Sequence, residues 1–519
     1  MSTGRRVAKA AGLMMVATVL SRILGYVRDV VIYTKFGQDS VTDAYNAAFS
    51  IPDFLYMLLV GGALSSAFIP VFSSYLATNQ EEEGWRVASI VFNVVMLLML
   101  IGIIIGLIFT PALMYLLVPH LPPAALTLSI YLTRIMFFQA FFMGLGGIAM
   151  GLLNAFNHFT APALGGVFYN LVIIGVGLLL TPQLGIAAFS LGVVLGAVVN
   201  FALQLPPLLK LGLRYHFSFD LHHPGVQKMF ILMIPVLIGL SVTQVNLFVN
   251  QNLASALPEG MISALRTAQR LMQLPIGIFA IAVAVAVFPT LTAQAARQEI
   301  AEFRRTFSLG VRTVIFVTFP AAVGLIVLRV PIVQLLFEQG NFDRWDTLAT
   351  AEALLYYSLG IFAYSAIQVL NRVFYALQDT RTPVTVGVLT IVLNTVLSVI
   401  LVRYMAHGGL ALAYSIAGVF NMVLLLALLR PKIGHIGGRL MLLSFGQTLL
   451  ASAAMAIFTL GTVQYVSNVV AFNPKINQLL IVSTGVTVGA VVFGVVALLL
   501  RMEEAEMVLN LVKGRFRRS

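Results

Sequence analysis

The chain of 519 residues contains no cysteine and few charged residues. The absence of cysteine excludes disulfide bonds, thiolate metal sites and a cysteine nucleophile. Aspartate, glutamate, lysine and arginine make up 10% of the sequence, whereas a soluble domain carries roughly 25%. Hydrophobic residues reach 60% and the mean hydropathy is +0.97. The composition therefore predicts a membrane protein.

The signatures of common enzymes are also missing. The sequence has no nucleophile triad motif, no Walker motif and no zinc-binding signature. Neither an enzyme nor an ATP-driven pump is indicated, and no cofactor is expected. The net charge of +12 does not indicate a nucleic-acid partner, because the basic residues stand between apolar runs and in the tail KGRFRR. Cytoplasmic loops of membrane proteins carry such an excess of positive charge.

What the sequence does contain is a series of long apolar runs. A bilayer core of about 30 Å requires ~20 apolar residues per helix. On that scale the sequence predicts about fourteen transmembrane helices, the first over residues 8–34 and the last over 476–501. The first run lacks a convincing cleavage site of small residues, so we interpret it as a retained helix. The expected fold class is an all-α integral membrane protein.

Lysines and arginines are distributed unevenly between the predicted loops. With the N-terminus inside, most fall in cytoplasmic segments, whereas the opposite loops hold chiefly Lys35, Arg344, Arg403 and Lys475. This bias predicts that both termini lie in the cytoplasm, which requires an even number of spans.

Three segments recur at a nearly constant distance along the chain. Residues 67–86 resemble residues 286–305 at an offset of 219, AFNHFTAP ending at Pro162 resembles ALQDTRTP ending at Pro383 at 221, and AAFS ending at Ser190 resembles LAYS ending at Ser415 at 225. Six spans fit within each offset, so the two copies share one polarity. Transporters with such repeats bind substrate at the interface between halves. The sequence predicts a six-helix lobe over residues 1–215, a second over 216–432, and a helix pair with a basic tail over 433–519.

A polar stretch joins the two predicted lobes and contains His216, His222 and His223. It has no carboxylate or cysteine at the spacing of metal ligands. We interpret it as a solvated cytoplasmic linker rather than a metal site.

The first span contains Arg22, Arg28 and Asp29. An ionised side chain in a span costs at least ~2.5 kcal/mol on insertion scales, so such residues face a cavity or a partner. Arg22 and Asp29 are seven residues apart on one helix face, and Gly25 between them permits a bend or a close backbone approach. An internal ion pair of Arg22 with Asp29 would leave Arg28 to be neutralised. The alternative is a site that binds an anion.

The eighth span contains RTAQRLMQ, in which Arg266 and Arg270 are four residues apart on one face. Two like charges one turn apart destabilise a helix unless an anion lies against them. The planar guanidinium suits phosphate oxygens, so the pair suggests a site for pyrophosphate or a related anion. Extension toward the outer membrane surface is the alternative explanation for Arg266.

The second span holds Asp43 and Asp53 and is interrupted by Pro52. Asp43 is either functional or a helix-start residue, where an acid interacts favourably with the helix dipole. Pro52 supplies a bend of the kind that alternating access requires. Asp53, and Glu352 in the tenth span, are the remaining acidic candidates.

Six motifs follow one another along the chain, namely SRILGYVRDVVIYTKFG from Ser21, TDAYNAAFSIPDFL from Thr42, GALSSAFIPVF from Gly62, QRLMQLPIGIF from Gln269, LFEQGNFD from Leu336 and FYALQDTRTP from Phe374. In this order they resemble the MurJ/MviN family of lipid II flippases, over essentially the whole chain. The resemblance implies the MOP-superfamily fold in the bacterial inner membrane, with two six-helix lobes, a V-shaped cavity, and a final helix pair that lines a groove for a lipid tail.

The resemblance also implies a substrate and its binding residues. The substrate is lipid II, the undecaprenyl-pyrophosphate-linked cell-wall precursor, carried from the cytoplasmic to the outer leaflet by alternating access. The arginines that bind its head group in the family match Arg22, Arg28 and Arg270, and the important acids match Asp29 and Asp43. Arg266 is expected to compensate for basic residues that many relatives have in the second span. Expected partners are lipid II, membrane lipids and cell-wall synthesis proteins.

Some members of the family bind sodium through aspartates of the seventh and eleventh spans. The matching positions here are Asn250 and, beside Asn394, Ser398. A sodium site made of these neutral residues would lack its formal negative charge. No other metal site is expected, and the membrane potential rather than sodium is the expected driving force.

Two other functions are open on the sequence alone. A flippase for another polyprenyl-pyrophosphate oligosaccharide would use the same anionic anchor. A MATE-like exporter of small cations should have a cavity dominated by acids, whereas the embedded charges here lean positive. A passive scaffold fits poorly with a duplicated fold and buried arginines.

Overall fold

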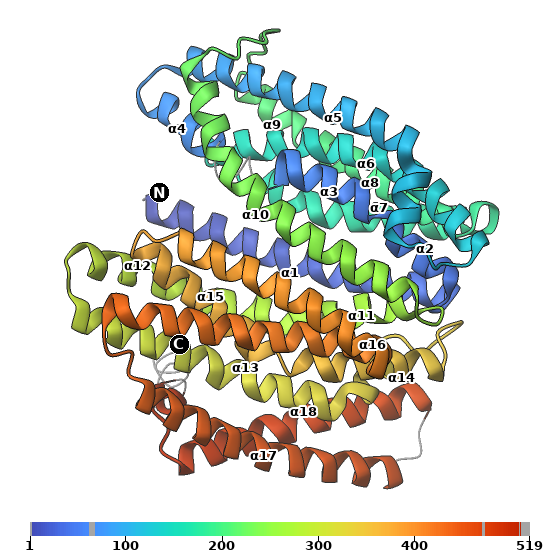
Figure 1. Cartoon of the computed structure of the whole chain (residues 1–519), viewed down its shortest axis with the longest axis vertical. Coiled ribbons are helices and arrows are strands. Elements are labelled where there is room, and N and C mark those ends of the chain that lie inside the picture. The colour runs from blue at the N-terminus through green and yellow to red at the C-terminus, as the bar shows by residue number, and fades with distance from the viewer. Residues whose placement is uncertain (1–2, 62–67, 470–472, 508, 510–519) are drawn as a thin grey trace. The chain divides into compact units, whose positions relative to one another are not determined.

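The computed structural model describes residues 3–61, 68–469, 473–507 and 509, and these contain helices but no strand (Figure 1). The predicted all-α fold is confirmed. The tail KGRFRR and residues 62–67 of the motif GALSSAFIPVF lie outside the described residues. The helices, with η marking π-helical segments, are α1 Thr3–Phe36, α2 Ser40–Ala48, α3 Ser50–Tyr56, η1 Met57–Gly61, α4 Ile69–Ala77, α5 Glu81–Leu117, α6 Pro123–Ala155, α7 Thr160–Leu184, α8 Ala187–Ala202, α9 Leu205–Lys210, α10 Pro224–Ser255, α11 Met261–Pro275, η3 Ile276–Ala280, α12 Ile281–Ala296, α13 Ile300–Leu336, α14 Arg344–Ser358, α15 Ile361–Ala376, α16 Arg381–Ile433, α17 Gly438–Val469 and α18 Pro474–Leu499.

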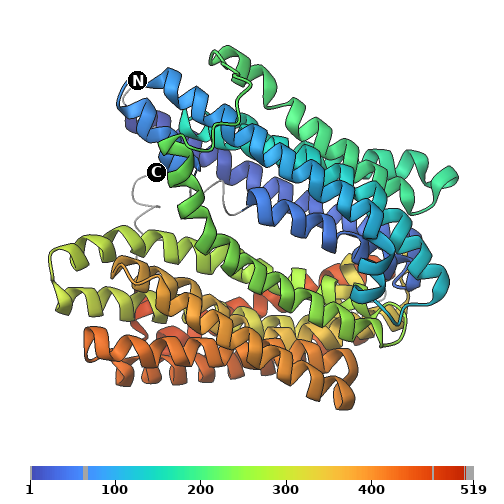
Figure 2. The same cartoon turned by 45° about the horizontal axis from the view of Figure 1, so that its top comes forward.

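The contacts divide the chain into two compact units, Met1–Ser263 and Ala264–Ser519. Within each unit the long helices run alongside one another (Figures 1 and 2). In the first unit the ring of Phe72 packs against the rings of Phe68, Trp85 and Phe156, with centroids 5.6 to 5.7 Å apart. In the second unit a core forms between α12, α13, α15 and α16. The division into three domains drawn from the sequence stays a prediction.

The duplication predicted from the sequence is visible in the element boundaries. α5 and α13 have the same length, and their starts and their ends are separated by the offset that relates the first pair of repeated segments. The start of α6 is related to the start of α14, and the end of α6 to the end of α15, by the offset that joins Pro162 to Pro383. α7 and α16 begin at that same offset. The two pseudo-symmetric lobes are therefore confirmed, and α17 and α18 follow the second copy.

Uncommon backbone conformations repeat in the same way. Positive φ angles occur in four pairs at nearly the same offset as the repeated segments, which are Asn79 and Gln298, Asn157 and Gln378, Gly185 and Ala406, and Gly212 and Gly434. Residues other than glycine rarely adopt such angles, so this agreement supports one ancestral set of turns. It also corrects one sequence alignment. Ser190 lies between Gly185 and Gly212, whose counterparts in the second copy are 221 and 222 residues further along the chain. The residue that corresponds to Ser190 therefore lies about one turn before Ser415, and the offset of 225 is wrong.

Nine of the described helices are long and apolar enough to cross a membrane, or ten if the bent pair α14 and α15 forms one span. α16 is counted once, although a straight helix of its 53 residues would be about 80 Å long. Its backbone breaks at Ala406, where φ is 47° and ψ is −130°. α16 therefore consists of two consecutive arms of membrane length. The count of fourteen spans is consistent with these helices and stays a prediction.

The second predicted span is interrupted near Pro52. α2 ends at Ala48, α3 begins at Ser50, and the helix widens into the π-helical η1. Pro52 has no N–H to donate to the carbonyl of Ala48 one turn earlier. The break therefore lies one turn before the proline rather than at it. Movement about this break stays a prediction.

The C-terminal helices α17 and α18 pack on each other and on α13 (Figure 1). At the start of α18, the Lys475 ammonium donates to the carbonyl of Gln334 at 3.1 Å, where a cation complements the dipole at the end of α13. Elsewhere on α13, Arg312 lies 3.4 Å from the buried Glu504, which also accepts from Ser444 of α17 at 3.0 Å. Polar contacts at two separate levels thus attach the helix pair to α13.

We expect Ala406→Gly to raise the thermal unfolding temperature of the detergent-purified protein. The φ and ψ angles of Ala406 fall in a region that is essentially restricted to glycine and costs about 1 to 3 kcal/mol for other residues. Its counterpart Gly185 has nearly the same angles, 55° and −139°. Ala413→Gly, at a buried helical position of α16, is the control and should lower the temperature. A lower temperature for Ala406→Gly as well would contradict strain at this break.

Candidate functional site

α1 carries a largely buried ion pair. The Arg28 guanidinium donates to Oδ1 of Asp29, with Nη2 at 3.0 Å and Nε at 3.2 Å. Nη1 of Arg28 donates to Oδ1 of Asn170 in α7 at 3.2 Å. Only 13% of the Arg28 side chain and 10% of the Asp29 side chain are exposed. Arg28 is therefore neutralised by its neighbour in the chain, and Asn170 sets the direction of its guanidinium.

Asn170 was not selected from the sequence, although it holds Arg28. Its amide donates to the carbonyls of Gly166 at 2.9 Å and Ser21 at 3.2 Å. These two bonds fix the side-chain oxygen toward Arg28. A single amide within the apolar run of α7 is the signal that would have found it, because polar groups in a span need partners.

Of the two interpretations of this span, the internal ion pair of Arg22 with Asp29 is wrong, since Asp29 pairs with Arg28. Arg22 is exposed, and among the described residues no hydrogen bond or ion pair is recorded for it. α1 is one continuous helix through Gly25, and the hinge at this residue stays a prediction. A Cβ atom at Gly25 would lie 3.8 Å from Oδ1 of Asn170. Gly25 therefore marks the close approach of α1 to α7.

The Asp43 carboxylate is buried and accepts three hydrogen bonds from the start of α11. Its donors are the backbone N–H of Gly260 at 2.7 Å, the backbone N–H of Ser263 at 2.8 Å and the Ser263 hydroxyl at 2.7 Å. Gly260 has a φ of 87°, and a Cβ there would meet the carbonyl oxygen of Gln38 at 2.2 Å, so only glycine fits. Asp43 lies in the first turn of α2 as expected, but it caps another helix.

Arg266 and Arg270 follow on the next turns of α11 and are both half-buried. Gln269 and Gln273 lie on the same face, half-buried and exposed respectively. Most of the other positions of α11, including Ala264, are buried. The arginine pair thus lies on the one polar face of this helix, as its spacing predicts.

The remaining acidic candidates have ordinary polar neighbours. Oδ1 of Asp53 lies 3.5 Å from the Gln139 amide nitrogen. A carboxylate oxygen of Glu352 lies 3.8 Å from Nε2 of His407. These contacts are compatible with structural roles for both acids.

The residues proposed for a neutral ion site lie on two helices. Asn250 of α10 donates to Oδ1 of Asn246 at 2.8 Å. Asn394 and Ser398 are buried one turn apart on α16. Within the part of the chain that the structure describes, no cluster of three His, Cys, Asp or Glu residues suits a metal ion. A sodium site at the three neutral residues stays a prediction.

The histidine-containing stretch after α9 is attached to α5. Nδ1 of His223 accepts from the backbone N–H of Gly225 at 3.1 Å, and its Nε2 lies 3.1 Å from Glu83. The Tyr215 hydroxyl donates to Oδ1 of Asn93 at 2.7 Å. These contacts match the interpretation of a polar linker.

Arg372 is a second residue that the sequence reasoning missed. It lies on α15, is half-buried, and places its guanidinium carbon 5.2 Å from the ring centre of Phe288 on α12. An arginine over an aromatic face gains a cation–π attraction. Arg372 could have been found from the sequence, because it is an arginine inside the predicted tenth span, and Arg28 was selected on the same ground.

Comparison with known proteins places this arrangement in a family. The family model described as lipid II flippase MurJ matches residues 32–480. The probable lipid II flippase MurJ of Vibrio cholerae is 33% identical over 435 residues, which cover 82% of this chain and 83% of that protein. The lipid II flippase MurJ of Burkholderia cenocepacia is 29% identical over 423 residues, 80% of this chain and 82% of the relative.

Solved structures agree with these relatives. A lipid II flippase MurJ in an inward closed conformation matches with a TM-score of 0.80 and 28% identity, over 94% of this chain and 99% of that one. An inward-facing multidrug resistance MATE transporter matches with a TM-score of 0.67 over 82% of this chain and 99% of that one, and its 15% identity shows a shared fold alone. The chain is a multi-pass membrane protein that belongs to the lipid II flippase MurJ family.

Proposed function

We propose that this protein is a flippase that carries lipid II from the cytoplasmic to the outer leaflet of the inner membrane by alternating access. The observation that carries the proposal is the match to the MurJ family over residues 32–480, which cover the first copy of the repeat from the last turn of α1 onward and the whole second copy. The protein is a transporter, so its residues bind and release the substrate without covalent chemistry.

The pyrophosphate of lipid II is an anion that must be bound where water is scarce. We propose that arginines of α1 and α11 bind its phosphate oxygens, namely Arg22, Arg28, Arg266 and Arg270. Arginine presents a planar fork of donors that matches two phosphate oxygens at once. Asp29 contributes by orienting Arg28, which it contacts at 3.0 Å. An exporter of cations would need the opposite sign of charge at these positions.

Asp43 acts as a positioning residue in this proposal. Its carboxylate is occupied by three donors at the start of α11, and a carboxylate would repel a pyrophosphate. By fixing the first turn of α11, Asp43 sets the positions of Arg266 and Arg270 on the turns that follow. The break before Pro52 is the hinge that we propose for the second span.

The distribution of lysine and arginine supports an orientation with both termini in the cytoplasm. In that orientation, reporter fusions at Tyr215 and His435 should report a cytoplasmic location, and a fusion at His120 should report the outer side. The reversed pattern would contradict both the orientation and the direction of transport. Partners among the cell-wall synthesis proteins stay a prediction.

We expect Arg270→Ala to abolish growth of a strain depleted of its own lipid II flippase while the variant still inserts into the membrane. A hydrogen-bonded charge is worth about 1.5 to 3 kcal/mol, so flipping in proteoliposomes should fall roughly tenfold to a hundredfold. Arg270→Lys should also be impaired, because a point charge lacks the fork.

Arg297→Gln is the matched control, because Arg297 is an exposed cation whose side chain is 72% accessible. It should support growth as the unmodified protein does. Full growth with both Arg270 variants would remove Arg270 from the site. Failure of the unmodified protein despite membrane insertion would instead favour another polyprenyl-pyrophosphate substrate.

We expect Asp43→Ala to lower the thermal unfolding temperature along with flipping. It leaves two buried N–H groups and a hydroxyl without their acceptor, at about 1 to 3 kcal/mol for each group. Asp43→Asn keeps one carbonyl oxygen and should lose less stability. If Asp43→Ala abolishes flipping at an unchanged unfolding temperature, Asp43 acts on the substrate directly and the positioning role is wrong.

A further inference from the structure

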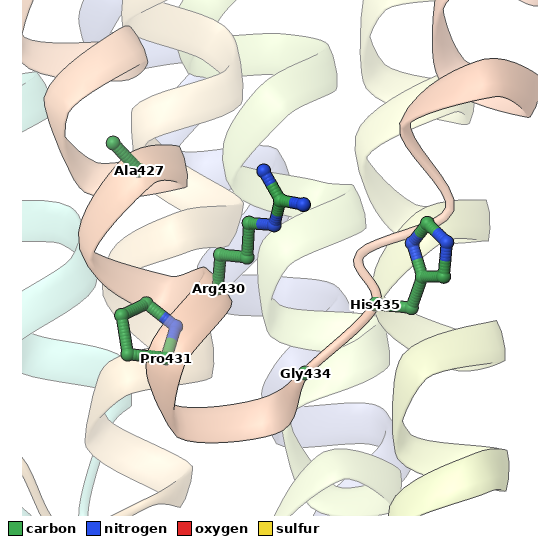
Figure 3. A pocket seen from close by; sticks show the side chains of 5 residues that line it. All are labelled: Ala427, Arg430, Pro431, Gly434 and His435. Carbon is green, nitrogen blue, oxygen red and sulfur yellow. The ribbon is translucent and has the colours of Figure 1, made fainter.

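A pocket of about 520 Å³ opens at the corner where α16 leads into α17. Its lining residues are Ala427, Arg430, Pro431, Gly434 and His435. Figure 3 shows Arg430 on the last turns of α16 and His435 on the loop that follows the helix. The pocket therefore has two nitrogen-bearing side chains in an otherwise apolar or backbone lining.

Two other polar groups at the end of α16, the Ile433 carbonyl and the Lys432 ammonium, already have partners. The Arg304 guanidinium donates to the carbonyl of Ile433, the last residue of the helix. The Lys432 ammonium lies 2.9 Å from the Asp379 carboxylate. Burial raises the pKa of Asp379, but hydrogen bonds from Thr382 and Lys432 outweigh it and lower the pKa to about 2. Lys432 therefore keeps an ionised partner at physiological pH.

Arg430 and His435 are left available by these contacts. Both are exposed, and within the described part of the chain no ion pair or hydrogen bond is recorded for either side chain. The nearby acid Asp379 is occupied by Lys432 and Thr382. The pocket thus presents an arginine without a neutralising partner, which is the chemistry that recognises a phosphate.

An exposed apolar stripe leads to the pocket along α16. Phe420 and Val423 are 37% and 53% exposed, and Ala427 is exposed as well. The three residues stand at helical spacings of three and four, so they share one face with Arg430. At the start of α17, Leu440 is 60% exposed. A ligand with a phosphate at the pocket and hydrocarbon along this stripe would fit both parts.

We propose that this corner binds an anionic membrane phospholipid, with its phosphate against Arg430 and His435 and its acyl chains along the face of Phe420, Val423 and Ala427. Basic pockets between transmembrane helices on the cytoplasmic side bind lipid head groups in this way. The apolar stripe favours a lipid over a free phosphate ion. The site is separate from the arginines assigned to lipid II and does not depend on that assignment.

The test is native mass spectrometry of the full chain in detergent, titrated with phosphatidylglycerol, phosphatidylcholine or inorganic phosphate. We expect phosphatidylglycerol to bind, and the double variant Arg430→Gln/His435→Gln to weaken that binding about tenfold. Arg297→Gln removes one exposed positive charge elsewhere and should leave binding unchanged. The thermal unfolding temperature of each variant, which should not change, serves as the check on folding.

Three outcomes would overturn the proposal. Unchanged phosphatidylglycerol binding in the double variant would remove the two residues from any lipid site. Equal binding of phosphatidylcholine would show that anionic charge is not recognised. Inorganic phosphate that binds as tightly as phosphatidylglycerol would show a phosphate site without a lipid.

Discussion

The backbone groups at helix ends need partners because hydrocarbon supplies no water, and long-range polar contacts of the protein meet this requirement. The Asp43 carboxylate accepts from the N–H groups at the start of α11. Lys475 donates to carbonyls at the end of α13, and Arg304 donates to the last carbonyl of α16. The acid thus contacts a helix start and the two cations contact helix ends, where the helix dipole favours each charge.

The two copies of the repeat share their turns but differ in the charged side chains of their first helices. Helix ends and positive φ angles recur at nearly constant offsets because local geometry sets them. The charged side chains of α1 are not repeated. α1 carries Arg22, Arg28 and Asp29, whereas its counterpart α10 has no charged residue after Lys228. The two copies thus share the scaffold, whereas the arginines proposed to bind the anion differ between them.

The pairing of Arg28 with Asp29 bears on the proposed role of Arg28 in binding an anion. An unpaired arginine in a span carries a desolvation cost that a neighbouring carboxylate offsets. Asn170 adds a third contact that keeps the guanidinium directed while it is paired. A substrate phosphate would then meet an arginine that is already oriented, which reduces the entropy lost on binding.

The sequence by itself determined that the protein is helical, lies in a membrane, is duplicated and belongs to a flippase family, because hydropathy, spacing and motif order can be read along the chain. Even the polar face of α11 followed from the four-residue spacing of Arg266 and Arg270. The tertiary structure decided which charges meet. Arg28 contacts Asn170, 142 residues away, and Asp43 contacts Gly260, 217 residues away. Such partners depend on how helices pack, which the spacing of residues within one helix does not determine.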